Sequence, residues 1–210
     1  MKIYTKLVFP ALFISFGFSD DNYPSVWDSL MNFIQWKPVK QTEKYQLSEY
    51  KFDGYPIPAF KIEMILKAKP KSILDVVWDV TNYPKALPSA FITDSGIYKK
   101  QDSTQAAWQI IDIPFLAPRL YQFQHIRNRN RIDWYNISVE QIVNKDLIIA
   151  PVNMGSWIIS TKEGKEYLIY IVLTNPGGQI PAWVVKQAQM RVLPQMLMET
   201  EKTALKLKKK

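Results

Sequence analysis

The chain of 210 residues contains no cysteine and only one histidine, His125. Without cysteine there is no disulfide framework, no thiolate nucleophile and no metal site with sulfur ligands. One histidine, with no acidic residues at metal-ligand spacing, also leaves no pattern for a metal centre of another type. The two adjacent glycines do not form a phosphate-binding loop. We therefore expect neither a metal nor another cofactor.

Residues that could carry catalysis are equally few. His125 lies in a segment with alternating side chains, on the same predicted strand face as Tyr121 and Phe123. No nucleophile elbow accompanies it, and a lone histidine in a strand is usually structural. The sequence therefore predicts a protein that is not an enzyme. An enzyme would have to use His125, Asp112 or Glu140 as its acid or base.

The chain has an excess of positive charge, with a formal net charge of +8 and a sequence pI near 9.4. The basic residues are scattered, except in the C-terminal run Lys206–Lys210. This run either is a solvated helix end that complements the helix dipole or makes transient contact with an anionic membrane surface. No nucleic-acid-binding motif is present, so we expect no nucleic acid partner. We expect a monomer.

The N-terminus has the pattern of a secretory signal. Lys2 and Lys6 precede a short apolar run over residues 7–18, and an acidic pair follows it. The run is shorter than the roughly 20 residues that span a bilayer. The sequence therefore predicts a signal peptide over residues 1–19 and an exported protein, periplasmic or secreted. An uncleaved membrane anchor or a buried terminal segment is the alternative.

Apolar periodicity predicts two helices and a series of strands ahead of the C-terminal region. A helix over residues 24–36 is indicated by apolar residues at helical spacing, Trp27, Leu30, Met31 and Ile34. We therefore assign residues 20–44 to an N-terminal helical segment. A second helix is expected over residues 70–80, where Pro70 suits the first turn. Strands are expected over residues 45–52, 60–66, 95–100, 105–113, 119–127, 132–141, 155–160 and 167–173.

The C-terminal region begins with a sharp turn and continues as a long helix. Gly177 and Gly178 permit positive φ angles, and Pro181 suits a helix start. About 25 residues without glycine follow, with an apolar face at helical spacing formed by Val185, Ala188, Val192 and Met196. Strands followed by a long amphipathic helix predict an α+β fold in which this helix covers an apolar space.

Four short blocks, in this order along the chain, resemble the START (StAR-related lipid-transfer) domain family of the helix-grip, or Bet v 1-like, superfamily. They are Pro58-Ala59-Phe60 with Asp75 to Pro84, Trp108-x-x-x-Asp112-x-Pro114-Phe115-x-x-x-Arg119, Gly155-x-Trp157, and Ile180-Pro181-x-Trp183 with Leu193-Pro194. The resemblance spans roughly Tyr45 to Leu207. It implies a curved antiparallel sheet wrapped around the long C-terminal helix, an internal cavity, and a lipid-binding domain over residues 45–210.

The resemblance also implies a function. We expect the protein to bind a single lipid or other hydrophobic molecule in the cavity, with the C-terminal helix as the gate, and to transfer or store it. Two alternatives are an enzyme of the superfamily acting on a cavity-bound compound, and an interaction module whose cavity is filled by its own side chains.

Seven residues are candidates for ligand contact. In START domains a charged residue on the part of the sheet that corresponds to Arg119 can lie inside the cavity and meet the polar end of a lipid. A buried guanidinium binds phosphate or carboxylate well. Alternatively, Arg119 pairs with Asp112 at the sheet edge. The other candidates are apolar or aromatic and could equally be ordinary core: Trp108, Tyr121, Trp157, Trp183 and Met190. Trp183, at the helix start, would also suit a membrane interface.

Overall fold

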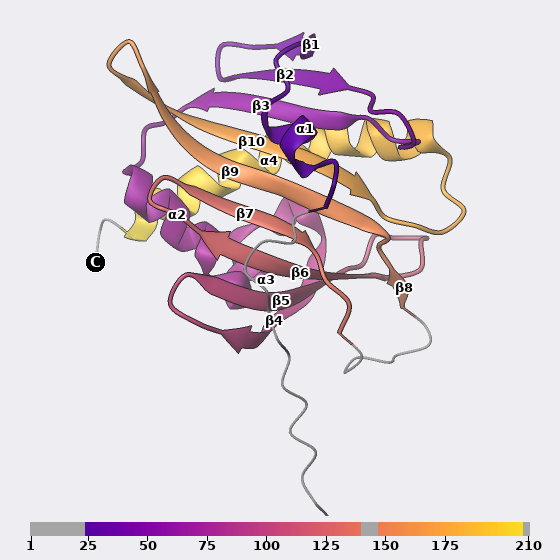
Figure 1. Cartoon of the computed structure of the whole chain (residues 1–210). Coiled ribbons are helices and arrows are strands. Elements are labelled where there is room, and N and C mark those ends of the chain that lie inside the picture. Colours follow the sequence, from indigo (N-terminus) through magenta and orange to yellow (C-terminus); the bar gives the residue numbers. More distant parts are fainter. Residues whose placement is uncertain (1–23, 140–146, 208–210) are drawn as a thin grey trace, which may run out of the picture.

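The computed structural model describes residues 24–139 and 147–207. The predicted signal peptide, Glu140 and the last three lysines lie outside the described residues. Figure 1 shows a large sheet with the long C-terminal helix α4 (Ala182–Leu207) lying across one face and the short helix α1 (Trp27–Met31) lying on the other. This is the predicted α+β, helix-grip arrangement, so the expected fold class is confirmed.

Among the described residues, ten strands form one sheet. Its strands are β1 (Lys37–Gln41), β2 (Tyr45–Tyr50), β3 (Ala59–Ile65), β4 (Ile92–Lys100), β5 (Thr104–Ile111), β6 (Arg119–Arg127), β7 (Arg131–Asn136), β8 (Ile148–Ile149), β9 (Val152–Lys162) and β10 (Lys165–Asn175). The order across the sheet is β1-β2-β3-β10-β9-β7-β6-β5-β4, and these neighbours are antiparallel. β8 pairs with β6 in parallel. The last strand in the sequence therefore lies in the middle of the sheet.

Short helices connect β3 to β4 along one end of α4. α2 (Pro70–Trp78) begins with Pro70 in its first turn, where the missing N–H costs no helical hydrogen bond. α2 ends two residues before the predicted limit. The chain continues as η1 (Val80–Asn82), α3 (Tyr83–Ala86) and η2 (Pro88–Ala90). η2 ends at Phe91, which has a left-handed φ of 55° and turns the chain into β4.

The predicted helix over residues 24–36 is wrong in its extent. Between residues 24 and 44 the helix is confined to α1, and residues 37–41, part of the predicted N-terminal helical segment, form the edge strand β1. After α1, Phe33 packs against aromatic residues, with its ring centroid 3.8 Å from that of Tyr50 and 5.4 Å from that of Phe52, whereas Ile34 is exposed. Periodicity alone did not distinguish this packing from a continued helix.

Two apolar cores lie on the two faces of the sheet. The larger core fills the space between the sheet, α2, α3 and α4, and it includes Phe60, Ile73 and Leu197. The smaller core lies under α1 on the other face, where Trp27 and Leu30 are buried against β9 and β10. Fully burying a side chain such as Leu30 contributes roughly 1.5–3 kcal/mol. Both faces of the central strands are therefore covered.

Polar contacts fix α4 at both ends. Near its start, Lys186 forms an ion pair of 2.8 Å with Glu49 of β2. Near its end, the Ser89 hydroxyl donates to Glu199 at 2.8 Å. Pro194 lies inside the helix and removes one backbone hydrogen bond. Within the described part of the chain, no helix combines the length and the apolar character that crossing a membrane requires.

Candidate functional site

A cavity of about 180 Å³ lies between the first half of α4 and the inner face of the sheet. β5, β6, β7, β9 and β10 form its floor, and the α3–η2 region closes one side. The residues that line it are Tyr83, Leu87, Ala90, Phe91, Ile92, Gln109, Ile111, Ile113, Tyr121, Phe123, His125, Trp134, Asn153, Trp157, Tyr170, Val172, Thr174, Pro176, Val185, Ala188, Gln189, Val192, Leu193 and Met196. Most of them are apolar or aromatic.

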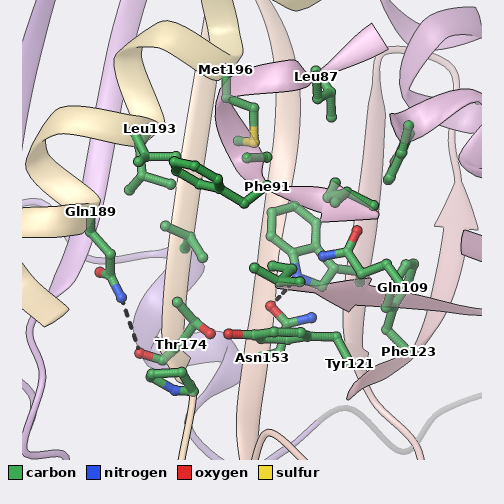
Figure 2. A pocket seen from close by; sticks show the side chains of 18 of the residues that line it. Leu87, Phe91, Gln109, Tyr121, Phe123, Asn153, Thr174, Gln189, Leu193 and Met196 are labelled. Atoms are coloured by element: carbon green, nitrogen blue, oxygen red, sulfur yellow. Dashed lines mark hydrogen bonds between the residues drawn. The ribbon is translucent and has the colours of Figure 1, made fainter. Parts of the chain in front are cut away.

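One part of the wall is purely apolar. Figure 2 shows Leu193 and Met196 of α4 facing Leu87 and Phe91, which come from the segment between α3 and β4. Phe91 is 41% exposed, so it also borders solvent. An apolar surface assembled from α4 and a separate segment changes shape whenever α4 moves.

A group of polar side chains lies on the other side of the cavity in Figure 2, where Thr174, Tyr121, Asn153 and Gln189 come together. The Thr174 hydroxyl donates to the Val152 carbonyl at 3.0 Å. Burial raises the pKa of Tyr121 to about 12, although a hydrogen bond with Thr174 and the charge of Arg119 act in the opposite direction. Tyr121 is therefore an uncharged hydroxyl at neutral pH.

Asn153 and Gln189 differ in how their amide groups are used. The Trp134 indole N–H donates to Oδ1 of Asn153 at 3.2 Å. Nε2 of Gln189 donates to the Thr174 carbonyl at 3.5 Å, a long hydrogen bond. Oε1 of Gln189 is buried and has no hydrogen-bond partner. Gln189 therefore carries a buried acceptor that neither a protein donor nor the open space of the cavity reaches.

His125 lines the cavity, and its surroundings keep it neutral. Burial lowers its pKa to about 3. An imidazole with such a pKa is a weak base and carries no charge at neutral pH. Asp112, the second candidate acid or base, is exposed and does not line the cavity. The third candidate, Glu140, lies outside the described residues.

The cavity wall is uncharged. Burial raises the pKa values of Tyr83 and Tyr170, so both stay protonated. The described residues that line the cavity include no Asp, Glu, Lys or Arg. Within ranges 24–139 and 147–207, no group of three or more His, Cys, Asp or Glu residues could hold a metal ion.

Of the seven predicted contact residues, Tyr121 and Trp157 line the cavity. Met190 packs against the main core beside it. Trp108 alternates with the cavity-lining Gln109 along β5, and it therefore lies on the opposite face of the sheet. Trp183 is 69% exposed at the start of α4. The ligand contacts of these residues stay predictions.

The proposed pairing of Arg119 with Asp112 is wrong, because the ion pairs among the described residues do not include it. Arg119 is only 3% exposed, and its Nη1 donates to the Ala117 carbonyl. Its Nε has no hydrogen-bond partner. Nη2 lies close to the Gly178 backbone, 3.4 Å from where a Cβ would be. Arg119 thus sits next to the cavity without lining it, and its contact with a ligand's polar end stays a prediction.

Sequence reasoning missed the polar residues Gln109, Asn153, Thr174 and Gln189. Gln109, Asn153 and Thr174 each occur in an otherwise apolar stretch of a strand, which is the signal that could have identified them, whereas Gln189 lies among polar residues of α4 and has no such signal. A polar residue on an inward-facing position is either paired within the core or available to a ligand.

Comparison of the sequence with protein-family models and with curated proteins gives no match. Solved structures do match. The StAR-related lipid transfer protein from Xanthomonas axonopodis superimposes with a TM-score of 0.72 at 18% identity, covering 80% of this chain and 98% of that chain. Human STARD10 superimposes with a TM-score of 0.73 at 17% identity, covering 87% of this chain and 78% of that chain.

This is the START fold. The resemblance predicted from the four sequence blocks is therefore confirmed at the level of fold. A weaker likeness extends to the di-domain ARO/CYC StfQ from the steffimycin biosynthetic pathway, with a TM-score of 0.52 at 10% identity, covering 70% of this chain and 48% of that chain. A protein from a biosynthetic pathway thus has a similar architecture.

Proposed function

We propose that this protein binds one hydrophobic molecule in the cavity between α4 and the sheet and transfers or stores it. The observation that carries the proposal is the cavity itself, whose wall is mostly apolar with a few polar groups gathered on one side. Ligand sites in proteins usually have this composition. The START fold supports the proposal, because one solved protein with this fold is named a StAR-related lipid transfer protein and another is human STARD10.

The size of the cavity limits what fits without movement. Its volume of about 180 Å³ is below the roughly 300–1,000 Å³ of most ligand pockets. An engineered dry cavity of about 150 Å³ binds benzene. The cavity therefore suits a molecule of about one ring or a short chain, and a long acyl chain requires the space to widen.

The gate that we propose is the first half of α4 with the turn before it. Six cavity-lining residues lie on α4 from Val185 to Met196, so displacing this part opens the apolar wall. Pro194 removes a helical hydrogen bond within this part, which makes local displacement easier. Each CH₂ group of a ligand buried there contributes about 0.8 kcal/mol.

The membrane contact that we propose is made by exposed apolar side chains beside the cavity. Trp183 lies two residues before the cavity-lining Val185, and the fully exposed Phe115 lies two residues after the cavity-lining Ile113. Indole rings are favoured at membrane interfaces. Lys206 lies near the other end of α4, about 35 Å away along the helix axis. Trp183 and the basic tail would therefore contact a membrane at separate points.

Export as a monomer, with residues 1–19 removed as a signal peptide, completes the proposal. The basic residues and the short apolar run at the N-terminus support it. Intact-mass measurement on protein from its native host tests the export, because retention of residues 1–19 would contradict it. Native mass spectrometry of the same sample tests the monomer.

The experiment that tests the binding function is extraction of protein purified from its native host, followed by mass spectrometry of the organic phase. One hydrophobic molecule per chain is the expected result. A reproducibly empty extract, together with failure of the folded protein to take up any added hydrophobic probe, would overturn the proposal. That result would favour an interaction module with a filled cavity.

A further inference from the structure

We infer that the molecule held in this cavity carries an acceptor oxygen, such as that of a carbonyl group, and that this oxygen accepts a hydrogen bond from Nε2 of His125. This inference rests on the proposed function, and it narrows the ligand to one chemical class, apolar molecules with a carbonyl-like oxygen. It also gives His125 a role in ligand binding rather than in catalysis.

Neighbouring groups place the proton of the His125 ring on Nε2. The Trp78 carbonyl accepts a hydrogen bond from Nε2 of Gln105, so the NH₂ group of that amide lies on the side where Nδ1 of His125 is 3.2 Å away. Nδ1 therefore accepts, and the ring proton is assigned to Nε2. Burial also lowers the pKa of the ring, so the imidazole stays neutral and Nε2–H is its one free donor.

Nε2 of His125 faces the cavity. Among the described residues no group accepts a hydrogen bond from it, yet the surrounding atoms do not seal it off completely, as they do Oε1 of Gln189 and Nε of Arg119. His125 is only 3% exposed and lines the cavity, as do Tyr121 and Phe123 on the same face of β6 (Figure 2). The open space beside Nε2 is therefore the cavity, and a group held there can reach this donor.

The cavity wall carries two further donors that the fold does not use. Trp157 and Tyr170 both line the cavity, and the indole N–H of the first and the hydroxyl of the second have no hydrogen-bond partner among the described residues. Neither atom is sealed off. The Tyr83 hydroxyl, by contrast, donates to the Val77 carbonyl at 2.6 Å. Because a donor without an acceptor is unfavourable, these groups together favour a ligand that supplies an acceptor oxygen.

The charge of Arg119 acts in the same direction. Arg119 does not line the cavity and its unpartnered Nε is buried, so this atom donates to nothing held there. Its charge nevertheless reaches the wall, because it opposes the rise in the pKa of Tyr121, two residues further along β6. A positive charge beside an uncharged wall favours an electron-rich ligand atom, and a carbonyl oxygen is one.

Two probes of the same shape test the inference by NMR. Acetophenone and α-methylstyrene each have one ring, which suits a cavity of about 180 Å³, but the carbonyl oxygen of the first is a CH₂ group in the second. His125 is the only histidine, so labelling the untagged chain with ¹⁵N-histidine makes a single ring visible. We expect its proton on Nε2, and we expect the signal of this proton to move downfield with acetophenone but not with α-methylstyrene.

Titration calorimetry on variants tests the same contact. His125→Phe removes the donor at nearly constant size. Tyr83→Phe is the matched control, because Tyr83 also lines the cavity but its hydroxyl is already used by the Val77 carbonyl. Comparing the ratio of the two affinities between parent and variant removes the difference in hydrophobicity of the probes. We expect His125→Phe to weaken acetophenone relative to α-methylstyrene about tenfold, as loss of one hydrogen bond predicts, and Tyr83→Phe to leave the ratio unchanged.

Three results would overturn this inference and leave the proposed function intact: a proton on Nδ1 of His125, equal signal changes with both probes, or an unchanged affinity ratio in His125→Phe. If His125→Phe does not fold, the NMR measurement on the parent decides. Failure of both probes to bind would also overturn the inference, and together with an empty native extract it would overturn the proposed function as well.

Discussion

Nε2 of Gln105 lies 3.2 Å from Nδ1 of His125 and 2.9 Å from the carbonyl oxygen of Trp78. The carbonyl requires a donor, so the NH₂ group of Gln105 faces both atoms. Nδ1 of His125 must then accept, and the ring proton lies on Nε2. Protonating Nδ1 would bring two donors together in a buried site, which agrees with a pKa lowered to about 3.

This arrangement predicts a pH dependence of stability. The unfolded chain binds a proton at His125 below about pH 6.5, whereas the folded chain does not until about pH 3. The stabilisation from a neutral His125 is thus complete above pH 6.5 and is lost as the pH falls. Between these values, the free energy of unfolding should decrease by roughly 1.4 kcal/mol per pH unit from this group.

The measurement is denaturant unfolding at pH 6.5 and pH 5.0, values within that window. His125→Gln, which stays uncharged, should lose this part of the slope even if it is less stable at every pH. Identical slopes for the parent and the variant would contradict the proposed neutral state of His125.

Gly155 is predicted to tolerate no side chain. A Cβ there would overlap the carbonyl oxygen of Ile171 and come within 2.5 Å of the Trp134 ring. Gly155→Ala should therefore lower the free energy of unfolding by about 3 kcal/mol. Gly164→Ala is the control, because its φ of 72° is strained but nothing lies within 4 Å, and it should cost about 1 kcal/mol. Similar losses in both variants would show that backbone strain, not contact, dominates.

Replacing Arg119 tests its role beside the cavity. Arg119→Met removes a guanidinium that is almost fully buried and has no acid partner among residues 24–139 and 147–207. We expect the free energy of unfolding to stay the same or to rise by about 1 kcal/mol, because an uncompensated buried charge is unfavourable. The affinity for a neutral apolar probe such as octanol, measured by titration calorimetry, should not change. A loss of affinity of about tenfold or more would instead support Arg119 as the residue that meets the polar end of the ligand.

The exposed ring of Trp183 is predicted to make contact with membranes. Trp183→Ser should weaken binding to lipid vesicles on the order of tenfold, as loss of one buried aromatic side chain predicts. Gln187→Ser, at an exposed position one turn later, serves as the control. Vesicle sedimentation at low and high salt is the measurement. If Trp183→Ser binds vesicles as well as the parent does, and both lose binding at high salt, the membrane contact is made by the basic residues instead.

The strands could be predicted from the sequence because apolar and charged side chains alternate in some of them, such as β3, and because β-branched and aromatic residues are frequent in others, such as β10. The expected strand over residues 119–127 coincides with β6, and most others differ from the observed strands by a few residues at their ends. β1 was missed because Pro38 and two lysines give it the composition of a loop, although an edge strand tolerates such residues. The sequence does not predict α3, because a proline disfavours helical structure in the residue before it, whereas Pro84 lies in the first turn of α3.

The cavity could be predicted only in part, because alternation separates the two faces of a strand without showing which face is inside. The sequence therefore predicts Trp108 as a ligand contact, whereas its neighbour Gln109 lines the cavity. In this protein α1 and its aromatic neighbours also cover the outer face, so burial on both sides hides the difference further. The orientation of the Gln189 side chain depends on its hydrogen bond to the Thr174 carbonyl, 15 residues earlier in the chain and on another element. No local sequence pattern reveals this contact.

The central place of β10 has a consequence for synthesis of the protein. β10 joins the unit β1-β2-β3 to β9, so the two parts of the sheet cannot meet until residues 165–175 have left the ribosome. Until then, β3 and β9 each expose an unpaired edge, and α4, which seals the cavity, has not yet been made. A nascent chain that stops before Lys165 should therefore depend on chaperones or aggregate through these edges, and completion of the last fifth of the chain should trigger folding as a single step.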